Sequence, residues 1–195
     1  MVGGFSLSTG ALLDLAISRY AGKGTGEHSL LWQLHHVFEE GDIVLGDACY
    51  GSFFLFARLI AKGIDGVSPK MSGHKIDFSS GTRLGKNDHL VQWMKPKKPE
   101  WMDHETYENF PETITVREVS ITSQRPGFRS KTRIIVTTLT NVAEVTKDDL
   151  GEPSNYHLPM IFRVLAPIDP SNSLFGKSVL TYMTAASNDA NNAEK

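Results

Sequence analysis

The chain has 195 residues, enough for one ordinary domain with a real hydrophobic core. Hydrophobic residues make up 40% and charged residues 22%, which excludes a disordered or coiled-coil chain, and the formal net charge of -2 gives no overall nucleic-acid signature. The single cysteine excludes a disulfide framework, and no apolar run approaches the roughly 20 residues that span a bilayer. Composition therefore predicts a globular, cytoplasmic protein.

The first third of the chain alternates between predicted strands and helices. Residues 12–17 form a short apolar run typical of a strand, and residues 27–39 have the apolar spacing of an amphipathic helix. Gly41 can supply the left-handed residue that ends this helix. Residues 43–45 are a short β-branched run between two Gly-Asp pairs, which predicts a buried strand.

A second helix is predicted over residues 52–62, with Ser52 as its N-cap and Gly63 as its stop. Residues 64–67 then return as a strand. Strands and helices that alternate through short connections predict an α/β (α+β) fold, with a mixed sheet covered by helices.

The middle of the chain, residues 68–132, loses helical periodicity and is punctuated by Gly and Pro, which predicts an antiparallel β-insertion. Strands are expected at 89–94 and 113–122. Within the second strand the apolar positions switch from even to odd numbers, which predicts a β-bulge near Arg117 and Glu118. Residues 133–140 follow as a buried strand of the main sheet.

The last part, residues 151–195, has no sustained period and is predicted to be irregular or disordered. Four prolines interrupt it, and residues 185–195 form an Ala/Asn-rich tract of low complexity.

Asp47 is the carboxylate of greatest chemical interest, because it follows a predicted buried strand at the end where α/β sheets bind ligands. It could bind a hard cation such as magnesium, or it could only cap the next turn. Cys49 could be a nucleophile, but a small buried hydrophobe is the better interpretation. His28, His35 and His36 are predicted on a helix surface, since no Glu completes a zinc motif.

Basic residues are concentrated in two places. Between residues 115 and 133 lie five basic side chains against the single acid Glu118, and a lysine cluster at 95–98 lies between Trp93 and Trp101. Basic and aromatic side chains together suit a phosphate backbone, whereas a solvated edge that protects strands from aggregation is the alternative.

Several motifs occur in a fixed order along the chain. Residues 41–47 read Gly-Asp-Ile-Val-Leu-Gly-Asp, followed by Tyr-Gly-Ser-Phe at 50–53 and Gly-Ile-Asp at 63–65. Further matches lie at 77–78, 83–89, 93–96, 99–103, 111–113, 116–118, 127–129 and 136–140. Together they resemble bacterial insertion-sequence transposases of the DDE type, most closely the large IS-four-like family, in collinear order over residues 7–150.

The resemblance implies a ribonuclease H-like core, residues 1–67 and 133–150, interrupted by a β-rich insertion at 68–132. It implies DNA transposition, in which three carboxylates hold two Mg²⁺ ions that drive DNA cleavage and strand transfer. Asp47 falls on the second of these carboxylates. The implied partners are double-stranded DNA at transposon ends and another transposase subunit, with no membrane, in the cytoplasm or at the nucleoid. The expected DNA contacts are Arg117, Arg125, Arg129, Lys131, Arg133, Lys95, Lys97 and Lys98.

The chain also departs from the family pattern. The family's first catalytic Asp lies upstream of the segment that matches residues 6–10. Its final Glu belongs to a Tyr-x-x-Arg-x-x-x-Glu motif, yet residues 151–158 read Gly-Glu-Pro-Ser-Asn-Tyr-His-Leu. We therefore expect a truncated, catalytically inactive fragment. The alternatives are a non-catalytic DNA-binding remnant, which could regulate a full-length transposase, and an unfolded product whose sheet lacks its first strand.

Overall fold

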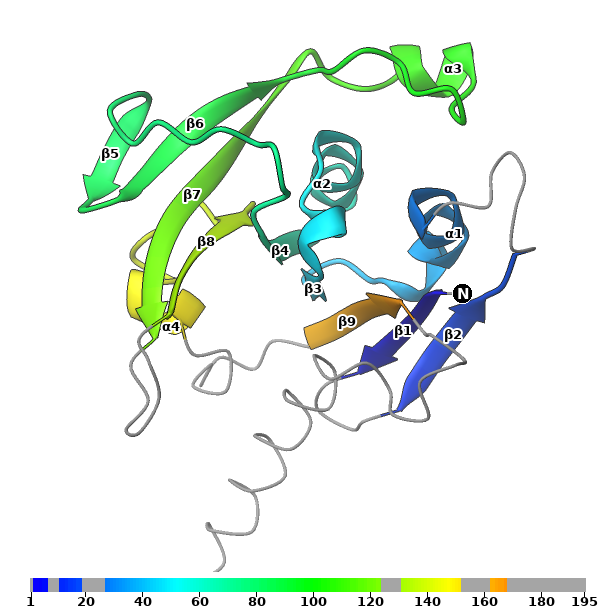
Figure 1. The fold of residues 1–195 in the computed structure, drawn as a ribbon. Coiled ribbons are helices and arrows are strands. Elements are labelled where there is room, and N and C mark those ends of the chain that lie inside the picture. Colours follow the sequence, from blue (N-terminus) through cyan, green and yellow to red (C-terminus); the bar gives the residue numbers. More distant parts are fainter. Residues whose placement is uncertain (1, 7–10, 19–26, 124–130, 152–161, 168–195) are drawn as a thin grey trace, which may run out of the picture.

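The computed structural model describes residues 2–6, 11–18, 27–123, 131–151 and 162–167 (Figure 1). Within them, strands form a nine-stranded mixed sheet in the order β2-β1-β9-β3-β4-β8-β7-β6-β5. The strands are β1 (Val2–Ser6), β2 (Leu12–Ala16), β3 (Ile43–Gly46), β4 (Asp65–Pro69), β5 (Thr82–Gly85), β6 (Asp88–Met94), β7 (Thr113–Ser123), β8 (Lys131–Thr137) and β9 (Phe162–Pro167). The helices are α1 (Glu27–Gln33), α2 (Phe53–Ile60), α3 (His104–Glu108) and α4 (Lys147–Gly151), with 3-10 turns η1 (Leu34–Val37) and η2 (Ala48–Tyr50). The predicted mixed α/β sheet is confirmed.

Strand β3 lies near the middle of the sheet and has two parallel neighbours. Ile43 is in register with Asp65 of β4 on one side and with Phe162 of β9 on the other. The remaining strand pairs are antiparallel. Ile43, Val44 and Leu45 are all buried, as expected for a strand that is covered on both faces.

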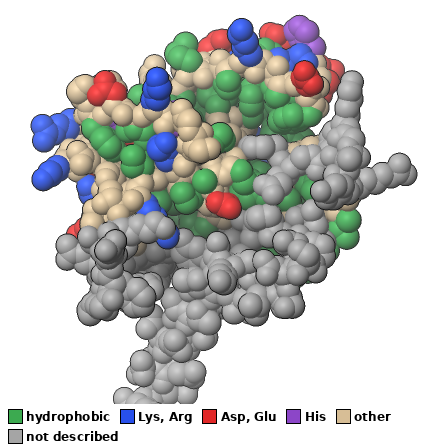
Figure 2. All heavy atoms as spheres, in the orientation of Figure 1, with side chains coloured by type: hydrophobic (Ala, Val, Ile, Leu, Met, Phe, Trp, Pro, Cys, Tyr) green, Lys and Arg blue, Asp and Glu red, His purple; other side chains and the backbone are tan. Residues whose placement is uncertain are grey.

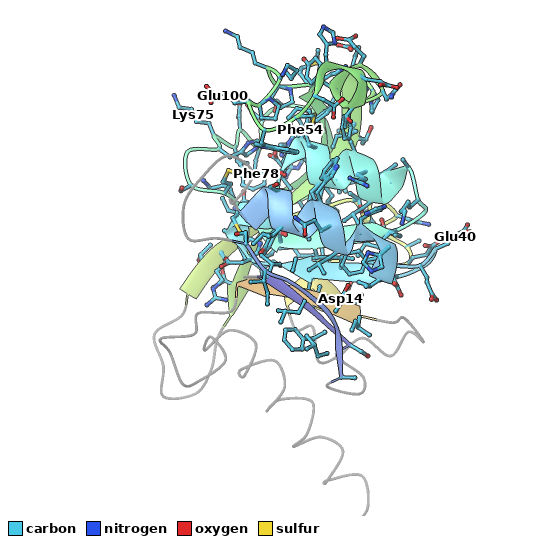
Figure 3. The ribbon with its side chains drawn as sticks, turned by 90° about the vertical axis from the view of Figure 1, so that its right-hand side faces the viewer. Asp14, Glu40, Phe54, Lys75, Phe78 and Glu100 are labelled. Carbon is cyan, nitrogen blue, oxygen red and sulfur yellow. The ribbon has the colours of Figure 1, made fainter. Side chains whose placement is uncertain are left out.

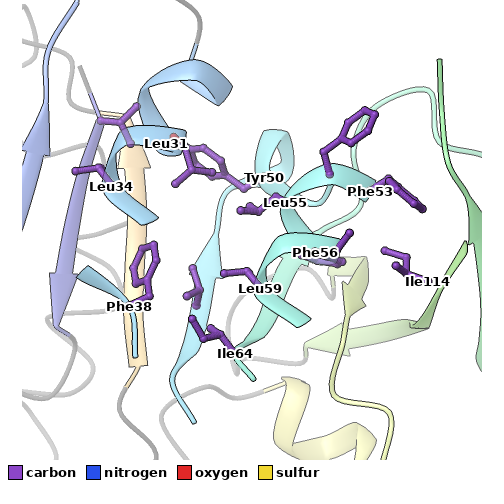
Figure 4. Packing of buried hydrophobic residues seen from close by; sticks show 14 of the residues in the cluster. Leu31, Leu34, Phe38, Tyr50, Phe53, Leu55, Phe56, Leu59, Ile64 and Ile114 are labelled. Carbon is purple, nitrogen blue, oxygen red and sulfur yellow. The ribbon is translucent and has the colours of Figure 1, made fainter. Parts of the chain in front are cut away.

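The two faces of the sheet pack against different helices. On one face, α1 and α2 contribute Leu31, Phe56 and Leu59 to a large apolar cluster that also contains Ile114 of β7 (Figure 4). On the other face, Leu150 of α4 joins a second apolar cluster. Its buried members are Ile43, Leu45, Val67, Val119, Leu139, Val145 and Leu150.

Both helices start where the sequence predicts, at Glu27 and, with Ser52 as N-cap, at Phe53, and both end before the predicted last residue. Gly63, with a φ of +69°, follows α2 and donates its N–H to the Ile60 carbonyl. Ser52 is extended and stands at the N-cap of α2, but its side chain makes no capping hydrogen bond. The helix expected at 27–39 is shorter, because it tightens into the 3-10 turn η1 after Gln33.

The β-bulge predicted near Arg117 and Glu118 is absent. The register of β7 is continuous against both β6 and β8. The apolar positions change parity because β7 is buried on both faces: Val116 packs in the α1/α2 cluster, whereas Val119 packs in the α4 cluster. Two buried faces therefore produce the pattern that an extra residue would also produce.

The region between β4 and β8 is an antiparallel arm. Strands β5, β6 and β7 form it, and β7 pairs with β8, so that the arm extends the main sheet (Figure 1). The expectation of an irregular tail is wrong for β9, because residues 162–167 form a strand between β1 and β3. The tract at 185–195 lies outside the described residues. Among the described helices, none has the length and apolar character needed to cross a membrane.

Candidate functional site

Asp47 lies directly after β3, at the carboxyl end of the parallel part of the sheet, as predicted. Its backbone is extended (φ -66°, ψ 171°), and its carboxylate accepts a hydrogen bond from the N–H of Ala48, so Asp47 caps the 3-10 turn η2. The side chain is exposed. The capping role is therefore present in the structure, and the carboxylate remains open to solvent at the end of the strand.

Within the described residues, the strands that flank β3 bring no second carboxylate to this edge. Gly46 is in register with Leu165 of β9, and β9 reads Phe-Arg-Val-Leu-Ala-Pro. On the other side β4 ends at Pro69, and the next residue is Lys70. Asp42 and Asp65 lie at the opposite, amino ends of β3 and β4, where Oδ2 of Asp42 accepts from the Glu39 N–H and Oδ1 of Asp65 accepts from the Thr138 hydroxyl.

A two-metal site requires several convergent carboxylates. In the part of the chain that the structure describes, no group of three His, Cys, Asp or Glu side chains could hold a metal ion. Among the described residues, Asp47 therefore belongs to no such group.

Arg117 was predicted to contact DNA, and the structure corrects this prediction. Its side chain has no exposed surface, and its guanidinium forms a bidentate ion pair with Asp88 of β6, with Nε–Oδ1 and Nη2–Oδ2 distances of 2.9 and 2.7 Å. Nη1 donates to the Val145 carbonyl at 2.6 Å. A guanidinium that is fully buried and fully paired cannot reach a phosphate.

Lys95 is also unsuited to DNA contact. Its side chain is only 4% exposed, and Nζ donates to the carbonyl of Phe110 and to the carboxylate of Glu112, both at 3.0 Å. The ammonium group also lies 4.4 Å from the centre of the Tyr107 ring. These contacts tie the end of β6 to the segment after α3, which is a structural role.

The remaining basic residues divide into two groups at opposite ends of the arm. Arg133 is exposed on β8 in register with Ile121 of β7, whereas Lys97 and Lys98 are exposed just beyond the other end of β6. From Thr113 to Ile121 the strand spans eight steps, or roughly 27 Å. Arg125 and Arg129 lie outside the described residues, as does the side chain of Lys131.

The two tryptophans near the lysine cluster pack against other aromatic rings, although Trp101 remains exposed. Trp93 stacks on Phe56 with ring centres 5.9 Å apart, and Trp101 meets Trp32 edge-on at 5.5 Å. An apolar groove of about 170 Å³ lies beside this second pair. Its lining residues are Leu31, Trp32, Ser52, Phe54, Leu55, Pro99 and Trp101. Figure 2 shows one face of the molecule, with hydrophobic and basic side chains interspersed over it.

A buried polar cluster in the arm was not predicted. The carboxylate of Glu118, 3% exposed, lies 2.8 Å from Nε1 of Trp93 and 2.9 Å from Nε2 of both His74 and His89. Burial alone raises the pKa of Glu118, but the hydrogen bonds from Trp93, His74 and His89 outweigh it and hold the pKa below its ordinary value. These partners are 25 to 44 positions from Glu118, so no local motif could reveal them.

Cys49, His35 and His36 are the other residues considered as reactive or metal-binding groups. Cys49 forms no disulfide and is half-buried in η2. His36 is exposed and pairs with Asp14 of β2 at 3.1 Å, and His35 is half-buried on η1. The surface prediction is therefore confirmed for His36; the side chain of His28 lies outside the described residues.

Comparison of the chain with protein-family models, with curated proteins and with solved structures found no match.

Proposed function

We propose that this chain is a fragment of a DDE-type transposase and that its DNA cleavage and strand-transfer chemistry is inactive. The collinear motifs over residues 7–150 support the family. The observation that carries the proposal is the position of Asp47, directly after the central parallel strand, in a sheet whose antiparallel arm is inserted between β4 and β8. A carboxylate at that edge is where an α/β sheet presents a ligand site.

The inactivity follows from the number of ligands. Two metal ions that clamp the attacking and leaving oxygens need carboxylates from several elements, and among the described residues Asp47 is the carboxylate that follows the parallel strands at this sheet edge. Strand β9 is hydrogen-bonded to β3 beside Asp47, and its sequence contains no acidic residue. Without a complete ligand set, a hydroxide or 3′-hydroxyl nucleophile is not activated.

A nicking assay tests the proposal. The purified chain is incubated with Mg²⁺ or Mn²⁺ and a supercoiled plasmid that carries the DNA flanking its coding sequence. We expect no nicking above the background of Asp47→Ala. Asp47→Asn is the matched control, because the amide oxygen can still accept from the Ala48 N–H while the charge is lost. Nicking by the wild type that both variants abolish would show an active site and overturn the proposal.

The second candidate is a DNA-binding remnant that regulates a full-length transposase, and the exposed positions of Arg133, Lys97 and Lys98 favour it. Binding to a duplex should weaken with salt, and the slope of log K against log salt should fall by about 0.9 for each phosphate contact removed. Replacing these three residues with Ala should reduce the slope, whereas Lys62→Ala, after α2, should not. A slope that is unaffected by the triple variant would exclude this interface.

A further inference from the structure

Strand β2 is the outermost strand at one end of the sheet. Its exposed surface is largely apolar, because Leu12 is 52% exposed, Ile17 just beyond the strand is 67% exposed, and Leu15 is half-buried. Outer strands present unpaired N–H and C=O groups that recruit further strands, and natural proteins limit this with charges, prolines or bulges. In β2 the register with β1 shifts near its first residues, and the charged residue is Asp14.

The backbone groups of Leu15 face away from β1. In an antiparallel pair, alternate residues bond to the partner strand, and the residues between them point their N–H and C=O groups to the other side. Ser6 of β1 donates its N–H to the carbonyl of Ala11, on the β2 side. The alternation along β1 then turns Gly4 towards β2 as well, and Gly3 towards β9. Because Gly3 is in register with Leu15, the N–H and C=O of Leu15 point to the open edge of the sheet.

Asp14 covers the outward N–H of Leu15. Its Oδ1 accepts this N–H at 2.7 Å, and its Oδ2 lies 3.1 Å from Nε2 of His36 on η1; Asp14 is labelled in Figure 3. The His36 ring is itself held, since its Nδ1 lies 2.8 Å from the carbonyl oxygen of Gln33. The carboxylate is thus placed against the middle of the open edge, where a further strand would have to accept the same N–H.

A second copy of the chain is the partner that fits this edge. Two β2 strands related by a twofold axis pair antiparallel, and the residue on the axis faces its own counterpart. An axis at Leu15 joins the two outward-facing Leu15 residues in a hydrogen-bonded pair and places Leu13 beside Ile17 of the second copy. These three residues alternate along the strand, so both copies contribute them to one apolar stripe. An axis at Asp14 would instead place two carboxylates opposite each other, which is destabilising.

We propose that β2 is a self-association edge, through which two copies of the chain pair antiparallel about Leu15, and that Asp14 restrains this pairing by holding the Leu15 N–H. To form the pair, each Leu15 N–H leaves Asp14 and donates to the Leu15 carbonyl of the second copy. Removing the carboxylate therefore favours the dimer. The edge lies at the end of the sheet opposite β5 and does not depend on the proposed DNA chemistry.

Analytical ultracentrifugation of the full chain measures the restraint. We expect Asp14→Ala to lower the dimer Kd at least about tenfold relative to the wild type, because two Leu15 N–H groups per dimer become available. Asp14→Asn is the matched control: its amide oxygen can still accept the Leu15 N–H, so its Kd should stay within about threefold of the wild-type value. A Kd that Asp14→Ala leaves unchanged, or an Asp14→Ala chain that is still monomeric at roughly 1 mM, would overturn the proposal.

The apolar part of the edge is tested in the Asp14→Ala background. Ile17→Ser should raise the dimer Kd at least about tenfold, because it removes an apolar side chain of each copy from the stripe. Ile60→Ser is the control, since Ile60 is also exposed, at 43%, but lies on α2 outside the edge, and its Kd should not change. Equal effects of the two substitutions would show that the chains associate through exposed apolar surface in general and not through β2.

Disulfide formation identifies the register. With the axis at Leu15, residue 14 lies opposite residue 16 of the second copy in a non-hydrogen-bonded pair, whose Cα atoms are about 4.5 Å apart and can be joined by a disulfide. Under mild oxidation, Asp14→Cys/Ala16→Cys with Cys49→Ser should therefore form a covalent dimer, whereas Asp14→Cys with Cys49→Ser should not. A covalent dimer of the variant without Ala16→Cys, or none of the variant with it, would overturn pairing about Leu15.

Discussion

The ion pair between Arg117 and Asp88 is buried, and it neutralises two charges that could not otherwise be buried. Three guanidinium nitrogens have partners at 2.6 to 2.9 Å, from β6 and from the segment before α4. The pair therefore connects the arm to the α4 side of the sheet. Removing one partner leaves an uncompensated charge in the core.

Asp88→Ala should destabilise the protein by about 3–5 kcal/mol, because Arg117 would remain buried without its anion. The urea midpoint measures the change. Glu112→Ala is the matched control: Glu112 is 82% exposed, and Lys95 keeps its bond to the Phe110 carbonyl, so we expect a loss of less than about 1 kcal/mol. Equal losses in the two variants would contradict the structural role of the buried pair.

Local sequence predicts some of these site features but not the contacts between residues that are distant in the sequence. Asp47 could be placed from sequence, because a strand and its following cap are local features. Arg117 was assigned to a DNA surface from a local count of charges, while its partner Asp88 is 29 positions away. The Glu118 cluster was missed for the same reason, since its donors come from β6 and from the segment before β5.

At the scale of elements, Gly73 and Gly81 bracket the part of the chain that leads into β5. Both have positive φ, +85° and +73°. A Cβ on Gly73 would meet nothing within 4 Å, whereas a Cβ on Gly81 would lie 2.1 Å from the carbonyl oxygen of Leu90. Leu90 is in register with Thr82, so its carbonyl cannot move without disturbing the β5–β6 pairing.

Gly73→Ala should therefore lower the free energy of unfolding by about 1–2 kcal/mol, because Ala is strained in the left-handed conformation. Gly81→Ala should cost at least about 1 kcal/mol more, because the clash with Leu90 adds to the same conformational cost. Urea unfolding of both variants gives the comparison. A Gly81 variant as stable as the Gly73 variant would mean that β5 shifts freely against β6.

Elements with a clear period were predictable, and elements defined by their surroundings were not. The apolar runs at 43–45 and 64–67 correspond to β3 and β4 because continuous burial leaves a continuous apolar pattern. For β7 the prediction of a bulge was wrong, because burial on two faces also shifts the apolar positions from even to odd numbers. Residues 162–167 contain Arg163 and Pro167, so their local sequence does not predict a strand. They form β9 because they pair with β1 and β3.

At the scale of the whole molecule, β9 is the strand that joins the two parts of the sheet. It pairs with five residues of β1 and with four residues of β3. Without it, β1 and β3 would each present unpaired N–H and C=O groups in the middle of the sheet. The β1–β2 hairpin would then contact the rest of the protein mainly through α1 and η1, which pack on it.

A chain that ends at Gly151 should therefore lose the cooperative thermal transition or aggregate, because the exposed edges of β1 and β3 are templates for pairing with other chains. A chain that ends at Pro167 retains all nine strands and is the matched control, for which we expect a cooperative transition. Circular dichroism melts and light scattering distinguish the outcomes. Identical transitions for the two truncated chains would show that β9 does not complete the sheet. If β9 does complete the sheet, adding a β9 peptide to the shorter chain should restore the transition.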